Sequence, residues 1–271
     1  LLKCVCVSSG NDAAVALAEK VAGVTELFVE QMNNRARGLG MDDTHFVNPT
    51  GLTAEGHVTS AHDIALMSRE LLTKHPDIRS FTTIWTDSIR GGTFDLANTN
   101  KLIRRYDGAT GLKTGYTASA GYCISATAER EGMELIAVVM KGETADKRNA
   151  DAKALLNYGF SAYALVSAAP EEPLPALPVT MGETDSVSLT LPPEALTAVV
   201  EKGQAAALER RIDLPESLPA PVRQGQQVGT LTLCSGDTEL MTVPILAAED
   251  AAGRSWGRMF TDLLKMAVFA G

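Results

Sequence analysis

Four prolines fall within residues 168–178, and this segment limits the possible folds more than any other feature of the chain. Proline fixes its own backbone φ angle and lacks an amide hydrogen, so such a run favours an extended linker. The 271 residues also exceed one domain of about 100 to 200 residues. We therefore expect a first domain over 1–166, a linker over 167–178 and a second domain over 179–252.

The pattern before the linker predicts helices followed by short strands. Apolar residues recur at helical spacing over 13–24, 28–39 and 64–72, and Ser60 is a suitable cap for the third helix. Runs rich in β-branched and aromatic residues predict strands over 81–85, 111–117, 122–128 and 134–140, and a helix returns over 144–160. This order favours an α/β domain in which helices cover an antiparallel sheet.

Beyond the linker, short alternating runs separated by Gly and Pro predict a small all-β domain. Its strands are expected near 186–191, 199–203, 210–214, 228–234 and 239–245. Residues 253–271 then place Trp, Phe, Met and Leu on one face of an amphipathic helix and basic residues on the other. Such a helix suits a membrane surface, although docking on the protein itself remains open.

The formal net charge of −9 gives a phosphate backbone no electrostatic support, so we expect no nucleic-acid partner. The charge is uneven: residues 167–252 hold thirteen acidic and four basic residues, whereas the region before them is nearly neutral. The chain also opens on an apolar run without a start signal, and we expect it to begin inside an element.

Metal and nucleotide chemistry lack their usual motifs. The four histidines form no His-Glu-x-x-His pair, Cys4 and Cys6 have no second cysteine pair, and no glycine-rich phosphate loop occurs. We therefore expect no metal site and no organic cofactor. Two short motifs remain: Ser9-Gly10-Asn11, a Ser-x-Asn pattern, and Lys113-Thr114-Gly115 within a predicted strand.

These two motifs, in this order and about a hundred residues apart, are two of the three motifs of the penicillin-binding serine acyl enzymes. The sequences of 1–21, 46–63, 107–122 and 155–160 resemble the low-molecular-mass D-alanyl-D-alanine carboxypeptidases of the peptidase S11 type. The resemblance continues through the linker and the β-rich region to the end of the chain. It implies a β-lactamase/transpeptidase-like fold for the first domain.

The resemblance also implies a function. The expected reaction removes the terminal D-Ala from peptidoglycan stem peptides ending in D-Ala-D-Ala through a serine acyl-enzyme, and β-lactams are the expected inhibitors. The substrate places the protein outside the cytoplasm, at the outer face of the cytoplasmic membrane, with residues 253–271 on the membrane surface.

Three residues are candidates for catalysis. The hydroxyl of the attacking serine loses a proton that must reach the leaving amine, and Ser9 is the candidate for a second hydroxyl that relays it. Asn11 offers a carbonyl and an amide, which suit holding a substrate peptide group; a helix cap is the alternative role for this residue. Lys113 places a positive charge beside the reaction centre, where it favours an ionised nucleophile; a solvated surface lysine is the alternative.

Three further residues are candidates for substrate binding. The hydroxyl of Thr114 suits the free carboxylate of the terminal D-Ala, and Gly115 keeps a strand edge open for a peptide that adds as a strand. Arg148 falls where the resembling family places an arginine, and a guanidinium matches a carboxylate well. An ordinary surface arginine is the alternative for Arg148.

The third motif of the family, Ser-x-x-Lys, supplies the nucleophile and its base, and residues 1–271 contain no such motif. Either this motif lies upstream of Leu1 or this polypeptide cannot form the acyl-enzyme. A wall-associated or scaffolding protein without a nucleophile is therefore one alternative function. A β-lactamase-like hydrolase is the other alternative function, because such enzymes use the same kinds of motifs.

Overall fold

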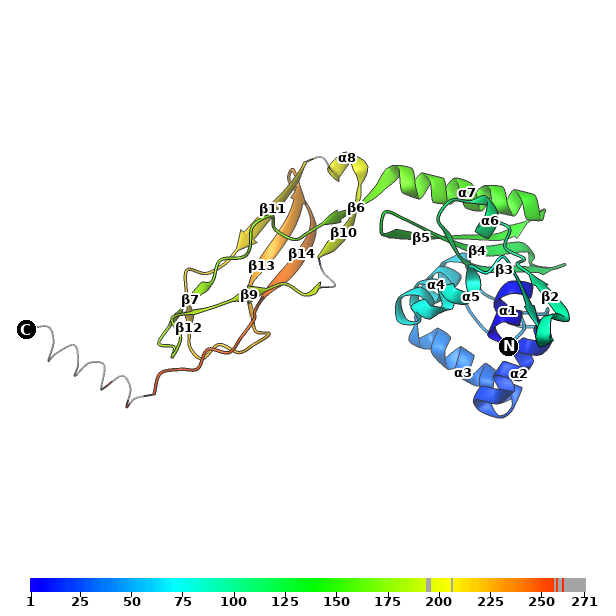
Figure 1. The fold of residues 1–271 in the computed structure, drawn as a ribbon, viewed down its shortest axis with the longest axis horizontal. Helices are drawn as coiled ribbons and strands as arrows, with labels where there is room; N and C mark the ends of the chain where they lie inside the picture. The colour runs from blue at the N-terminus through cyan, green and yellow to red at the C-terminus, as the bar shows by residue number, and fades with distance from the viewer. Residues whose placement is uncertain (194–195, 206, 256, 258–259, 261–271) are drawn as a thin grey trace, which may run out of the picture. The chain divides into compact units, whose positions relative to one another are not determined.

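The computed structural model describes residues 1–193, 196–205, 207–255, 257 and 260. Within it the chain forms two compact units, Leu1–Ser161 and Ala162–Gly271. Figure 1 colours the first unit from blue to green and the second from green to red. The predicted finer division, with boundaries at residues 166, 178 and 252, stays a prediction.

Helices make up much of the first unit. They are α1 (Leu2–Ser8), α2 (Asn11–Ala22), α3 (Thr25–Gly38), α4 (Ala61–Lys74), α5 (Arg79–Thr82), α6 (Leu102–Arg105) and α7 (Ala145–Ala162), with 3-10 turns at Pro76–Ile78 and Arg90–Gly92. The Ser60 hydroxyl caps α4 as predicted, because it accepts a hydrogen bond of 3.2 Å from the Asp63 amide. The other predicted helices are also present, in α2, α3 and α7.

The central sheet of the first unit is antiparallel and has the strand order β3-β4-β5. Its strands are β3 (Ala109–Thr117), β4 (Gly121–Arg130) and β5 (Met133–Gly142). A separate hairpin joins β1 (Thr86–Ile89) to β2 (Phe94–Ala97). The three predicted strands of the central sheet are confirmed, and β3 lies at one edge of it.

The strand predicted over 81–85 is wrong, because the short helix α5 includes Phe81 and Thr82. Aromatic and β-branched residues favour strands only when a neighbouring strand pairs with them. Here the Thr82 hydroxyl instead donates to the carbonyl of Thr110 at 2.7 Å, and α5 packs against β3 and α1. Tertiary contacts therefore override the local preference.

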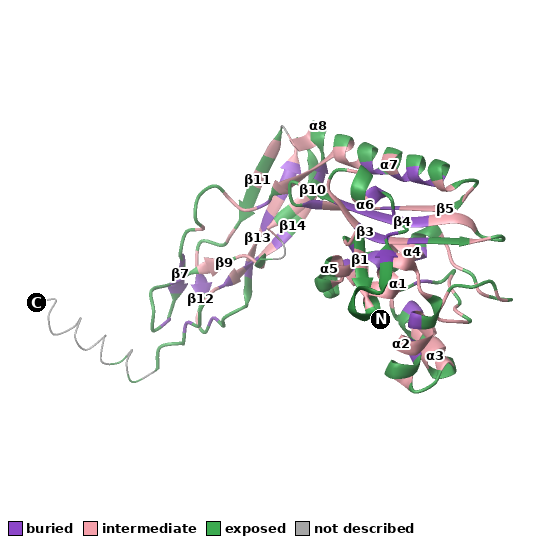
Figure 2. Cartoon of the chain, turned by 45° about the vertical axis from the view of Figure 1, so that its right-hand side comes forward, coloured by how far each residue is buried: buried purple, intermediate pink, exposed green. Residues whose placement is uncertain are grey.

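Helices cover both faces of the sheet. Apolar residues of β4 and β5 face α7 and α6, and Figure 2 shows this buried layer in purple along β4 and the inner side of α7. Alternate residues point to the opposite face, where the Ser125 hydroxyl lies 2.8 Å from that of Ser68 on α4. The apolar layer consists of Leu102, Ile124, Ala126, Ala128, Ala137, Ala152 and Leu156.

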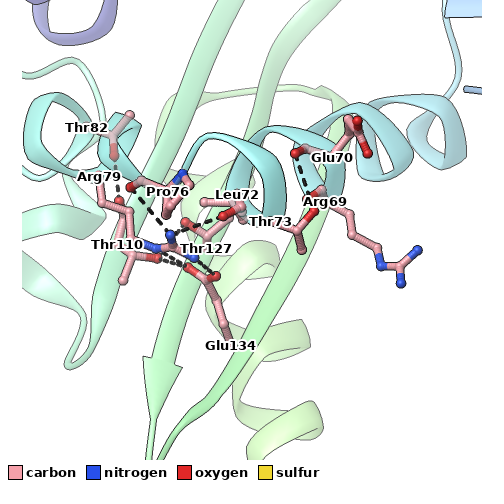
Figure 3. Close-up of polar contacts among 10 residues, drawn as sticks. All are labelled: Arg69, Glu70, Leu72, Thr73, Pro76, Arg79, Thr82, Thr110, Thr127 and Glu134. Carbon is pink, nitrogen blue, oxygen red and sulfur yellow. Dashed lines mark hydrogen bonds and ion pairs between the residues drawn. The ribbon is translucent and has the colours of Figure 1, made fainter. Parts of the chain in front are cut away.

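A polar cluster joins α5 to strands β3 and β5. Figure 3 shows Arg79 paired through two hydrogen bonds with the carboxylate of Glu134, which also accepts from Thr110 at 2.8 Å. This carboxylate raises the pKa of Arg79 through its hydrogen bond. A hollow of about 300 Å³ lies beside the cluster and is lined by Arg69, Leu72, Thr73, Glu134, Leu135 and Ile136.

The second unit is β-rich, which confirms the predicted all-β domain. Its strands are β6 (Tyr163–Ser167), β7 (Leu177–Thr180), β8 (Ser186–Val187), β9 (Leu189–Thr190), β10 (Thr197–Glu201), β11 (Leu208–Asp213), β12 (Leu218–Pro219), β13 (Gln227–Ser235) and β14 (Thr238–Ala247), with the short helix α8 (Lys202–Ala205). They form sheets ordered β11-β13-β14-β9, β12-β7-β8 and β10-β6. Residues such as Val187, Leu231 and Ile245 fill its core.

The amphipathic helix predicted over 253–271 lies mostly outside the described residues and stays a prediction. In the part of the chain that the structure describes, we find no helix with the length and apolar character needed to cross a membrane.

Candidate active site

Ser9 directly follows α1, at a tight turn that reverses the chain. Its φ of 58° and ψ of 42° are left-handed, a conformation that non-glycine residues seldom adopt, and the amide of Gly10 donates to the Cys4 carbonyl at 3.0 Å. The end of α1 is fixed by the buried Val7, whose carbonyl accepts from the amide of Thr99 at 3.0 Å. The Ser9 side chain is therefore held by a left-handed turn at the end of a helix that Val7 anchors.

Lys113 lies on β3, and its ammonium group donates to the hydroxyl of Ser9. The same group donates to the carbonyl of Thr114 at 2.6 Å. Burial lowers the pKa of Lys113 to about 8; the charge that Cys6 carries when ionised opposes this effect, and the positive charge of Arg148 adds to it. The structure thus brings together two predicted residues that lie 104 positions apart, and it lets the amine exchange a proton near neutral pH.

Thr114 and Gly115 continue the same strand. Thr114 is buried, and its hydroxyl lies 2.7 Å from that of Thr99, with either group able to donate. A Cβ atom added at Gly115 would meet no heavy atom within 4 Å, so open space adjoins the strand there. Among the described residues β3 pairs only with β4, which leaves its other edge available to an added strand.

Arg148 is buried in the first turns of α7, with 4% of its surface exposed. The guanidinium donates to the side-chain carbonyl of Asn149 at 2.9 Å and to the backbone carbonyl of Cys123 at 3.2 Å. No carboxylate of the described residues forms an ion pair with it, and burial lowers its pKa. A buried cation whose partners are neutral is stabilised by an anion that binds beside it.

Two local features that sequence reasoning missed position Arg148. The Thr144 hydroxyl caps α7 by accepting from the amide of Lys147 at 3.1 Å. A Cβ atom at Gly142 would lie 3.0 Å from that of Arg148, so a side chain there would push α7 away from β5. A Thr followed by a predicted helix is a recognisable cap signal, but the close approach at Gly142 has no sequence signal of its own.

Asn11 is not brought to Lys113 by a contact. It opens α2 at an exposed position, and its side chain forms no hydrogen bond with any described residue. The cap of α2 is Gly10, so Asn11 is not the side-chain cap considered as its alternative role. Its amide faces solvent close in sequence to Ser9, and its predicted role in holding a peptide group stays a prediction.

Comparisons with known proteins fit this arrangement. The family model described as D-alanyl-D-alanine carboxypeptidase matches residues 1–144, and the model described as penicillin-binding protein 5, C-terminal domain, matches residues 170–252. The chain belongs to the D-alanyl-D-alanine carboxypeptidase family. This finding confirms the resemblance inferred from the two motifs and from the segments around them.

Individual relatives of the family extend the likeness over most of the chain. A Bacillus subtilis relative, D-alanyl-D-alanine carboxypeptidase DacF, is 40% identical over 92% of this chain. The crystal structure of penicillin-binding protein 5 from Haemophilus influenzae covers 92% of the chain and 73% of its own, with a TM-score of 0.78 and 28% identity. Penicillin-binding protein D2 of Listeria monocytogenes, solved in an ampicillin-bound form, covers 58% of the chain and 65% of its own at 38% identity, with a TM-score of 0.55.

The chain spans 65% of the length of the B. subtilis relative. Its Ser-x-Asn and Lys-Thr-Gly motifs both lie inside the segment matched by the family model, whereas a Ser-x-x-Lys motif is absent from residues 1–271.

Proposed function

We propose that the protein carrying this chain is a serine D-alanyl-D-alanine carboxypeptidase that trims the terminal D-Ala from peptidoglycan pentapeptides. The contact between the Lys113 ammonium and the Ser9 hydroxyl carries this proposal, because it unites two catalytic motifs from distant parts of the chain. Membership of the carboxypeptidase family supports the same reaction. We assign catalysis to residues 1–166 and leave the β-rich region 179–252 outside the chemistry.

The reaction needs a serine nucleophile and a lysine base from a Ser-x-x-Lys motif, which residues 1–271 do not contain. The serine oxygen attacks the carbonyl carbon of the D-Ala-D-Ala bond, and the C–N bond breaks to leave an acyl-enzyme. The proton of the serine passes to the leaving amine, with the Ser9 hydroxyl as relay between base and amine. Water then hydrolyses the ester, which restores the serine and releases the shortened peptide.

Lys113 supports each step through its charge and its proton. In the charged form it stabilises negative charge that develops on the oxygen atoms near Ser9. Its pKa of about 8 also lets the amine release or take up a proton close to neutral pH. We assign Asn11 to the substrate peptide group, since its exposed amide supplies both a donor and an acceptor.

Recognition of the chain end falls to Arg148 and Thr114. Arg148 is a buried cation without an anionic partner among the described residues, so a carboxylate that enters beside it gains a charge-assisted hydrogen bond. Thr114 adds a hydroxyl, and the substrate pairs with the free edge of β3, where Gly115 leaves room. A β-lactam carries a carboxylate beside its reactive amide, so the same groups suit it as an inhibitor.

The location follows from this substrate. Peptidoglycan lies outside the cytoplasmic membrane, so we propose that the protein acts at the outer face of that membrane. The amphipathic pattern of residues 253–271 supports attachment to the membrane surface.

The full-length protein tests the proposal directly. We expect release of D-Ala from diacetyl-L-Lys-D-Ala-D-Ala, loss of activity in Ser9→Ala, and a fall of about ten- to hundredfold in kcat/KM for Arg148→Ala. Arg148→Lys, which keeps the charge, should recover part of that fall, mainly through KM. The matched control is Arg69→Ala, an exposed arginine beside the hollow at β5.

Two outcomes would contradict the assignment. Rapid turnover of penicillin with little D-Ala release would favour a β-lactamase. Absence of both activities in a folded full-length protein would favour the non-enzymatic, wall-associated alternative.

A further inference from the structure

Two tyrosines form a stacked pair at the end of the β3–β4 hairpin. Tyr116 and Tyr122 are direct cross-strand partners, and their ring centroids lie 4.4 Å apart with planes tilted by 34°. Tyr116 is nevertheless 59% exposed, and neither phenol forms a hydrogen bond with a described residue. The pair therefore presents a large, rigid aromatic surface to solvent at little cost in side-chain entropy.

The pair adjoins the proposed carboxylate site. Alternate residues of a strand share a face, so Tyr116 lies on the face of Thr114, two residues further along β3. Tyr122 directly precedes Cys123, whose carbonyl accepts from Arg148. The aromatic surface thus begins one strand step beyond the groups that hold the chain end.

The hairpin that carries the pair is fixed in place. The amide of Ala120 donates to the Thr117 hydroxyl at 3.1 Å, and the Ser119 hydroxyl lies 3.2 Å from that of Thr117. Ser119 also lies 3.3 Å from the hydroxyl of Thr53, which belongs to a separate loop. These bonds fix the turn that connects the strands of the two tyrosines.

We propose that Tyr116 and Tyr122 bind the side chain of the residue that precedes the D-Ala-D-Ala end, and that they select a long aliphatic side chain there. This inference rests on the proposed function. We consider a peptide that pairs antiparallel with β3 and has its terminal carboxylate at Thr114. Each residue further back from that terminus then lies beside the next higher residue number of β3. Extended residues advance about 3.4 Å each, so the third residue from the end lies level with Tyr116.

The chemistry of the pair favours methylene groups over charge. Each tyrosine ring offers an apolar face, and the positively charged Arg148 lies close enough to Tyr122 for the two groups to interact. That cation disfavours an ammonium on the bound side chain, so its methylene stem is the part that gains from contact. Contact with the tyrosine rings should remove part of this stem from water. A peptide with a long side chain should therefore be favoured over one with a methyl group by about five- to thirtyfold in kcat/KM.

The experiment compares two peptides with uncharged side chains, using the full-length protein. One is acetyl-(Nε-acetyl-L-Lys)-D-Ala-D-Ala and the other is acetyl-L-Ala-D-Ala-D-Ala. We expect the wild type to prefer the first by about five- to thirtyfold. Tyr116→Ala should remove this preference by lowering kcat/KM for the acetyl-lysine peptide, and Tyr116→Phe should keep it.

The matched control is Phe94→Ala, which removes an aromatic residue of β2 with a similar exposure of 51%. It should leave the preference unchanged. A preference that survives in Tyr116→Ala, or an equal fall for both peptides in that variant, would overturn the inference while the proposed function stands. Failure of the folded wild type to cleave either peptide would overturn both.

Discussion

Burial of the Lys113 ammonium should make the stability of the first unit depend on pH in a specific direction. Burial lowers the pKa of Lys113 from an ordinary value of 10.5 to about 8. Between pH 8 and 10.5 the unfolded chain still holds a proton that the folded chain has released. The free energy of unfolding therefore rises with pH in this window, and below pH 8 the full cost of the buried charge is present.

The size of the effect follows from the two pKa values. One pKa unit corresponds to about 1.4 kcal/mol, so the lowering to about 8 sets an upper limit of about 3 kcal/mol. Lys113 is half-buried, and solvent screening reduces the effect to about 1–3 kcal/mol. Lys113→Met keeps the length of the side chain without its charge, so it should remove this pH dependence.

Urea unfolding at several pH values between 7 and 11 measures the difference. Trp85 reports on the first unit when the other tryptophans of the protein are replaced by Phe. We expect the stability difference between Lys113→Met and wild type to become less favourable to the variant by about 1–3 kcal/mol from pH 7 to pH 11. Lys20→Met, at an exposed position of α2, removes an equal charge without desolvation and serves as control. Parallel curves for wild type and Lys113→Met would refute the reasoning.

Substitutions at three further positions test the packing and the polar contacts of the first unit. Leu156→Ala should cost about 2–5 kcal/mol in urea unfolding because Leu156 is 2% exposed in the core under α7, whereas Leu156→Met should cost less than about 1.5 kcal/mol. Glu134→Gln should cost about 1–3 kcal/mol because it leaves the partly buried Arg79 without its carboxylate; an unchanged urea midpoint would contradict this. Hydrogen bonds, chiefly from Thr44, lower the pKa of Asp63, so the stability that they provide is lost as pH falls below about 4. Asp63→Asn should be less stable at pH 7 and should lose less stability on acidification, which thermal unfolding across pH 2–7 measures.

The sequence predicts the central sheet well because its signals are local. The continuous apolar run in β5 and the Gly-rich turns between strands need no tertiary information to be recognised. The segment 81–85 fails for the opposite reason: its residue types suit a strand, and only the contact of Thr82 with the Thr110 carbonyl determines that a helix forms. Short segments depend most on such distant partners.

The sequence likewise predicts some features of the candidate site and misses others. Two motifs identify Ser9 and Lys113, yet only the fold shows that they touch. The same Ser-x-Asn pattern does not predict that Asn11 is exposed, because Asn11 opens a new helix whereas Ser9 ends the previous one. The sequence alone is also compatible with a surface position for Arg148. Its burial follows from the close approach of α7 to Gly142.

The candidate site contains two cations, Lys113 and Arg148. Lys113 is half-buried and Arg148 is almost fully buried, burial lowers the pKa of both, and the positive charge of Arg148 lowers that of Lys113 further. Such an arrangement costs stability in the empty protein, and neither cation forms an ion pair with a carboxylate of the described residues. An anion that binds between them removes part of that cost, so binding of a carboxylate should raise the pKa of Lys113. A substrate that carries its carboxylate at the chain end would thereby hold Lys113 in the charged form that we assign to the proposed acylation step, whereas an amidated peptide would not.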